Sequence, residues 1–211
     1  MTVEELMAYT PEHKIEVAST VLELCLEVLD MEFVREVCFY NDLIGETFNG
    51  AVTTDSDKLL LSLERMTGDG YPDVLPGEAI FLQICHVVAH EVRHVFQKRL
   101  AYEPWRIFER NPEIDDEARI NEIIEGFNSY QNLNGEAYEL QTLEIDANCF
   151  AVLVSCTLSG CVMQPSGSAK EKYAEGISKL IELYGETLKE TLTLEHFEEV
   201  LKENEEFYRE S

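Results

Sequence analysis

The sequence predicts an α+β domain in which a small, mostly antiparallel sheet is followed by helices. The segments rich in β-forming residues all lie between residues 35 and 66. Two strongly apolar segments with helical spacing follow them, at about 77–100 and 138–158. Strands that come early in a chain and helices that come late are typical of α+β domains.

The first predicted element is a helix over residues 11–33, because apolar residues recur there at helical spacing and Thr10 is a suitable N-cap. Residues 35–42 predict a short strand. Residues 46–66 predict a strand, a turn and a second strand, with the turn at 55–57.

The segment 67–77 is rich in helix-breaking residues and predicts a loop. The helix that follows it, up to about Leu100, is apolar on most sides, so we expect it to be central and buried. Residues 102–135 are less regular, and the second apolar helix is expected to stop at Gly160.

A single domain over residues 1–211 is expected, because this length only slightly exceeds that of an ordinary domain. Hydrophobic residues make up 45% of the chain, enough for a real core. Two acidic helices, at about 169–185 and 191–209 with Gly185 as a C-cap between them, form a C-terminal extension over 169–211. We expect this extension to pack on the core.

The net charge of -26, from 42 acidic and 16 basic residues, argues against a nucleic-acid partner, because contacts with phosphates need clustered Lys and Arg. It also disfavours an anionic membrane surface. The first residues include early acids and no apolar signal-peptide core, and no apolar run is expected to reach the length of a transmembrane helix. We therefore expect a soluble, cytoplasmic protein with reduced, buried cysteines.

Residues 90–94 read His-Glu-Val-Arg-His on the first apolar helix. Residues four apart lie one above the other on a helix, so His90 and His94 can present their imidazole nitrogens to one Zn²⁺ ion. Glu91 can reach a metal-bound water without itself being a ligand, which suits a general base. A metal site is favoured over a structural polar cluster, because these side chains would be costly to bury without partners.

The second apolar helix contains "LEIDANCFA", in which Glu144 and Asn148 are four apart and share a face. Glu144 is the predicted third ligand, and Asn148 is a predicted hydrogen-bond partner of a ligand histidine. Asp146 is the main competitor of Glu144 as the ligand.

"HEVRH", followed fifty residues after its last histidine by "EIDANCFA", resembles the gluzincin zinc metallopeptidases. The resemblance is to the branch whose glutamate helix reads E-x-x-A-D-x-F-A, which includes the membrane CAAX-processing peptidases and soluble relatives. Peptidases of the ImmA/IrrE type are also similar. Asn148 stands where these families usually carry Asp.

This resemblance implies a zincin-like fold with Zn²⁺ as the cofactor and His90, His94 and Glu144 as its ligands. It also implies hydrolysis of a peptide or protein substrate through a metal-bound water, with Glu91 as the general base. The alternative is a metal-containing binding or regulatory module without peptidase activity. The presence of Glu91 argues against that alternative, because a structural site needs no base and favours four protein ligands. Hydrolysis of a non-protein amide remains a third possibility.

Other residues have supporting roles in this interpretation. His86 is expected to support the site or to belong to the core, and Arg93 to form a salt bridge with an acidic neighbour. By the same resemblance, the segment 47–54 is a candidate sheet edge that pairs with an extended peptide. Tyr130 and Tyr138 are candidates for stabilising the oxyanion.

Overall fold

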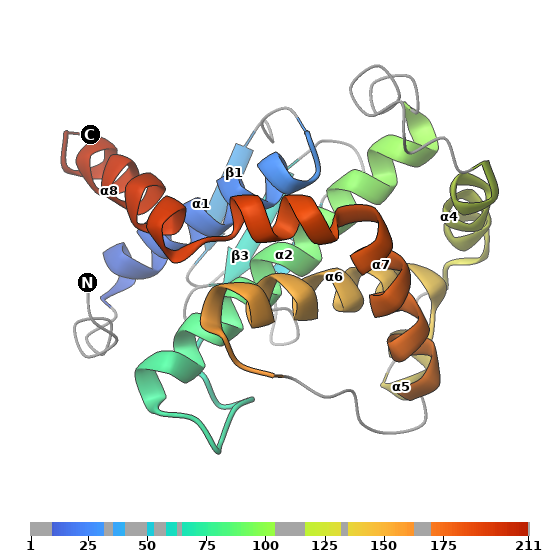
Figure 1. Cartoon of the computed structure of the whole chain (residues 1–211), viewed down its shortest axis with the longest axis horizontal. Helices are drawn as coiled ribbons and strands as arrows, with labels where there is room; N and C mark the ends of the chain where they lie inside the picture. Colours follow the sequence, from blue (N-terminus) through green and yellow to red (C-terminus); the bar gives the residue numbers. More distant parts are fainter. Residues whose placement is uncertain are drawn as a thin grey trace.

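The computed structural model describes residues 10–31, 36–40, 50–52, 58–62, 65–103, 117–131, 135–162 and 170–210. Within these residues the protein is mostly helical, with one small sheet (Figure 1). The predicted turn at 55–57 lies outside them. The elements, in chain order, are α1 (Pro11–Val28), β1 (Glu36–Tyr40), β2 (Gly50–Val52), β3 (Lys58–Ser62), α2 (Pro76–Tyr102), α4 (Glu117–Ser129), α5 (Glu136–Glu139), α6 (Thr142–Ser159), α7 (Lys170–Thr191) and α8 (Leu194–Glu210).

The sheet has the strand order β1-β3-β2 and is mixed rather than mostly antiparallel. β2 and β3 run antiparallel, with Ala51 opposite Leu60, whereas β1 and β3 run parallel, with Val37 opposite Leu59. The short connection from β2 to β3 suits an antiparallel pair, and the longer path from β1 to β3 allows a parallel one. Since β3 occupies the centre, β2 lies at an edge of the described sheet, where it contacts α2.

α1 begins as the sequence predicts, because the Thr10 side chain accepts a hydrogen bond from the His13 backbone N–H. The helix ends at Val28, earlier than predicted, because the chain turns and Asp30 adopts a left-handed φ of 46°. α1 then packs along α2.

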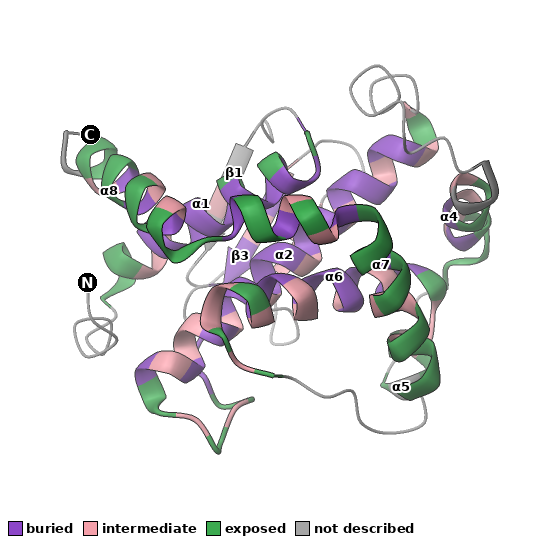
Figure 2. Cartoon of the chain, in the orientation of Figure 1, coloured by how far each residue is buried: buried purple, intermediate pink, exposed green. Residues whose placement is uncertain are grey.

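α2 is the central helix, as the sequence predicts, with α1 and α6 packed against it (Figures 1 and 2). Pro76 occupies its first turn, where the missing N–H costs nothing. Its core side chains have no exposed surface: Ile84, Val88, Val92, Val95, Phe96 and Leu100. A helix that is apolar on most sides is stabilised only when neighbours cover it on most sides, which explains this position.

α6 lies between α2 and α7 and ends at Gly160, whose left-handed φ of 70° forms the predicted cap. By length and composition α6 could span a membrane, with a mean hydropathy of 1.2 over Thr142–Ser159, which corrects the expectation that no apolar run is long enough. Half of this segment is buried inside the protein. Its packing is therefore that of a core helix.

The C-terminal helices pack on the core, α7 on α6 and α8 on α1. The prediction that Gly185 separates two helices is wrong, because α7 continues through it to Thr191. Leu180, Tyr184 and Leu188 form a buried stripe at helical spacing on both sides of this glycine. Burial of that stripe outweighs the cost of a glycine inside a helix, which is about 1 kcal/mol.

Candidate metal centre

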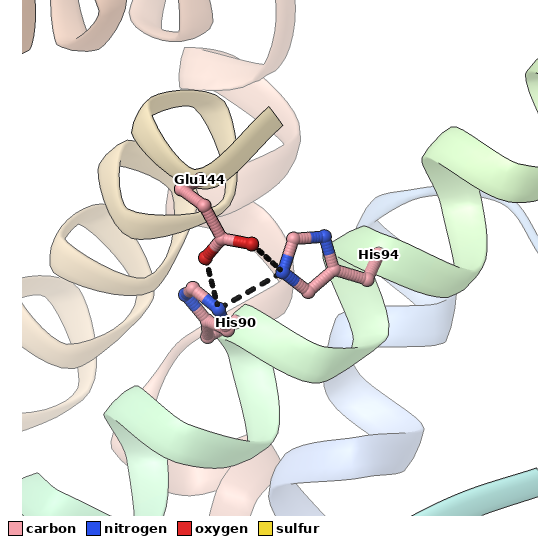
Figure 3. Close-up of side chains that lie close together, drawn as sticks. All are labelled: His90, His94 and Glu144. Atoms are coloured by element: carbon pink, nitrogen blue, oxygen red, sulfur yellow. Dashed lines mark hydrogen bonds and ion pairs between the residues drawn. The ribbon is translucent and has the colours of Figure 1, made fainter. Parts of the chain in front are cut away.

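His90 and His94 lie on successive turns of α2 and face Glu144 on α6 (Figure 3). Their Nε2 atoms are 3.0 Å apart. Glu144 Oε2 lies 3.3 Å from His90 Nε2, and Glu144 Oε1 lies 3.5 Å from His94 Nε2. One ligand atom from each residue lies within 4.8 Å of the others, so the three residues that the sequence predicts form a group that could hold a metal ion.

The close approach of α6 to α2 brings Glu144 to the histidines. Ala147 and Ala151 on α6 have no exposed surface, and their small side chains suit a tight helix pair. Glu144 itself is only 1% exposed, so the pair of helices holds its carboxylate out of water. Helix packing thus brings two motifs that are far apart in the sequence together in one site.

The electrostatics of the three residues favour positive charge at the point where they meet. Burial disfavours the charged form of Glu144, but the neighbouring imidazoles of His90 and His94 outweigh it and hold the Glu144 pKa well below its usual value. Burial also disfavours charge on His94, yet Glu144 and Glu91 raise the pKa of His94 to about 9. Among the described residues, Glu144 Oε2 receives no hydrogen bond. Two imidazoles and a carboxylate are a known zinc ligand set, so the residues fit the predicted Zn²⁺.

The outer nitrogen of each histidine contacts a side-chain amide. His90 Nδ1 lies 3.1 Å from Asn148 Oδ1, as the sequence predicts for Asn148. His94 Nδ1 lies 2.8 Å from Gln97 Oε1, a contact that the sequence interpretation missed. Gln97 is a polar residue three positions after His94, in a helix that the sequence predicts to be buried, and that combination was the available signal.

Asp146 binds Arg93 rather than joining the candidate ligands. Its carboxylate accepts hydrogen bonds from Arg93 Nε at 2.7 Å and from Arg93 Nη2 at 3.1 Å. The predicted salt bridge of Arg93 is therefore confirmed. Asp146, the competitor of Glu144, is held away from the group that could bind a metal.

Glu91 lies beside the candidate ligands and is 7% exposed. Burial raises the Glu91 pKa, and Glu144 adds to the rise, while His90 and His94 oppose it. On the sheet side, Glu91 contacts Gly50 at the start of β2, where an added Cβ would lie 2.6 Å from Glu91 Cγ. The edge strand thus passes directly over the proposed base and needs a glycine there.

A cavity of about 420 Å³ opens onto the group. Residues from α2, from β2 and from an aromatic wall line it: Gly50, Ala51, Val52, Glu91, His94, Lys98, Tyr102, Phe127, Tyr130, Tyr138, Leu143 and Glu144. The Tyr130 hydroxyl donates to Glu144 Oε1 at 2.9 Å. Burial, together with Glu144, raises the pKa of Tyr130 to about 12, so its hydroxyl remains a donor at neutral pH. The assignment of Tyr130 or Tyr138 to the oxyanion stays a prediction.

His86 lies one turn before His90, and the two rings stack with centroids 6.4 Å apart. It is not part of the candidate ligand group. Burial, with the neighbouring His90, lowers the pKa of His86 to about 4, so it is neutral at pH 7. This placement agrees with the prediction that His86 supports the site or belongs to the core rather than binding the metal.

Comparison of the chain with protein-family models, with curated proteins and with solved structures finds no match. The case for a zincin-like site is therefore carried by geometry. Two histidines with HxxxH spacing on α2 and a glutamate on α6 form a triad that is consistent with such a site.

Proposed function

We propose that the protein is a zinc-dependent metallopeptidase of the gluzincin type, with His90, His94 and Glu144 as zinc ligands. One observation carries the proposal. The nitrogens and oxygens of these residues converge within 4.8 Å, at the wall of a cavity that Glu91 also lines.

A zinc ion held by His90, His94 and Glu144 would lower the pKa of a bound water to near 7 and would polarise the carbonyl of the substrate. Glu91 accepts a proton from the attacking water and delivers it to the leaving amine. A raised pKa suits this role, because a carboxylate must both accept and release a proton near neutral pH. Because Glu91 is buried beside the proposed ligands, its carboxylate stays close to the water from which it would take the proton.

The position of the edge strand β2 favours a peptide as the substrate. Gly50, Ala51 and Val52 line the same cavity as Glu91, and β2 pairs only with β3 in the described sheet. An extended peptide can add to such an edge through backbone hydrogen bonds, which need no particular side chains. A peptide laid along β2 would pass over Glu91, because Gly50 contacts that side chain.

The alternative function, a metal-containing binding module, predicts a closed site with four protein ligands. In the described part of the chain, the group that could hold a metal consists of three residues, His90, His94 and Glu144, and it lies at a cavity. These features support the peptidase over the binding module. The cytoplasmic location expected from the sequence remains part of the proposal.

Glu91→Gln tests the proposed function, because it keeps the size of the side chain and removes its basicity. We expect the variant to bind zinc as the wild type does and to lose hydrolysis by at least about a hundredfold, the usual scale of general-base catalysis. The measurements are metal analysis of the purified proteins and digestion of a peptide library. Glu78→Gln is the matched control, on the same helix but about 18 Å before His90, and should leave both unchanged. Full hydrolysis by Glu91→Gln would overturn the mechanism.

A further inference from the structure

We infer that Gln97 is a positioning residue for His94: it holds the imidazole with Nδ1 protonated, leaving Nε2 to bind the metal. The inference rests on the proposed metal site and deepens it. Gln97 has no exposed surface, and it is absent from the lining of the substrate cavity. It therefore acts through His94 rather than on the substrate.

The orientation of the Gln97 amide is fixed by the two groups behind it. Its Nε2 donates one hydrogen bond to the Leu143 backbone carbonyl at 3.0 Å and another to Asp146 Oδ2 at 2.7 Å. A carbonyl oxygen and a carboxylate can only accept hydrogen bonds. A flipped amide would place Oε1 against both acceptors, so Nε2 must face them.

The other end of the amide then determines the proton on His94. Gln97 Oε1 faces His94 Nδ1 at 2.8 Å, and an amide oxygen can only accept. His94 Nδ1 must therefore carry a hydrogen. In the neutral imidazole the remaining nitrogen, Nε2, keeps its lone pair, and this is the atom that faces Glu144.

Asp146 is itself anchored, so it does not turn away from Gln97. Arg93 binds both of its oxygens, at 2.7 Å and 3.1 Å, and Arg93 is completely buried. Arg93 Nη1 donates to the Tyr184 hydroxyl at 3.4 Å, and its guanidinium lies 4.5 Å from the centroid of the Phe96 ring. A hydrogen-bonded chain thus runs from α7 through Arg93, Asp146 and Gln97 to His94.

Gln97→Met tests the inference, because methionine has a similar length and no hydrogen-bonding amide. The control is Gln83→Met on the same helix. The Gln83 amide also bridges two backbone groups, accepting from Gly68 N–H at 2.6 Å and donating to the Arg65 carbonyl at 3.0 Å, but it lies away from the site. The zinc dissociation constant of each protein is measured by competition with a chromogenic chelator, and folding by circular dichroism.

We expect Gln97→Met to weaken zinc binding about 10- to 100-fold, the usual effect of removing a partner of a metal-bound histidine. Gln83→Met should keep the wild-type zinc affinity even if it lowers thermal stability. Equal zinc affinity in folded Gln97→Met and wild type would overturn the inference. The proposed function fails separately, if the wild type binds no zinc or if Glu91→Gln still hydrolyses peptides.

A measurement on the wild type keeps the inference testable if Gln97→Met does not fold. Long-range ¹H–¹⁵N spectra of the zinc-loaded protein report which nitrogen of each histidine carries hydrogen. We expect His94 to bind zinc through Nε2 and to show an exchange-protected Nδ1–H. Coordination through Nδ1, or an unprotected Nδ1–H, would refute the role of Gln97.

Discussion

The surroundings of His90 and His94 differ on the side away from the candidate metal. Both histidines contact an amide oxygen, from Asn148 and Gln97 respectively. Behind Gln97 stand two groups that only accept hydrogen bonds. Behind Asn148 stands the Tyr173 hydroxyl, 3.3 Å from Asn148 Nδ2, and a hydroxyl can either donate or accept. An amide therefore orients a histidine only as firmly as the groups behind that amide orient it.

This difference changes the interpretation of the two motifs. The sequence drew attention to Asn148, because the resembled families carry a carboxylate there. The more firmly held histidine is His94, whose support comes from Gln97, Asp146 and Arg93. A carboxylate also supports a histidine in this protein, but it belongs to Asp146 and acts on His94 through the Gln97 amide.

The largest effect expected from this comparison is on stability. Asp146→Asn removes the charge that pairs with the buried Arg93, and leaving one member of such a pair unmatched costs about 3 kcal/mol in the free energy of unfolding. Asn148→Ala removes a neutral contact to His90 and should cost about 1 kcal/mol. Chemical denaturation of the metal-free proteins measures both values. Equal losses would show that the two sides are anchored alike.

A smaller effect, on zinc affinity, is expected when the amide that contacts His90 is replaced by a carboxylate. In Asn148→Asp both side-chain oxygens only accept, so His90 Nδ1 is fixed as a donor whatever Tyr173 does. We expect zinc affinity to rise by up to about tenfold, the lower end of the range for such partners. Tyr173→Phe, which leaves the amide in place, is the control for loss of the hydroxyl. A weaker zinc affinity in Asn148→Asp would contradict the view that Asn148 is the looser support.

Much of the fold near the site could be predicted from local patterns. Apolar spacing identified the central helix and the helix that carries Glu144, and the i, i+4 rule placed His90 and His94 on one face. The parallel pairing of β1 with β3 could not be predicted in this way, because it depends on which strand fills the centre of the sheet. The continuation of α7 through Gly185 depends on burial of its stripe against the core.

In the candidate site, too, some features could be predicted from local patterns and others depend on tertiary packing. Its candidate ligands follow from residue type and spacing within each helix. The role of Gln97 requires the Leu143 carbonyl and Asp146 of another helix to lie behind its amide, and only tertiary packing brings them there. Similarly, Gly50 and Glu91 are far apart in sequence, and their contact arises where the sheet edge crosses α2.

The most direct test of the central claim is a calorimetric titration of the metal-free protein with zinc, in buffers of different ionisation enthalpy and at pH 7 to 9. The pKa of His94 is raised to about 9, so in the metal-free protein at pH 7 this imidazole is positively charged and carries a proton on each of its two nitrogens. Zinc requires the neutral imidazole, so binding at pH 7 must release one of these protons, and affinity should rise about tenfold per pH unit toward pH 9 and then level off.

We expect one zinc ion per chain, with proton release at pH 7, and loss of this binding in Glu144→Ala. Absence of zinc binding by the wild type, or wild-type binding by Glu144→Ala, would contradict the assignment of His90, His94 and Glu144 as a metal centre.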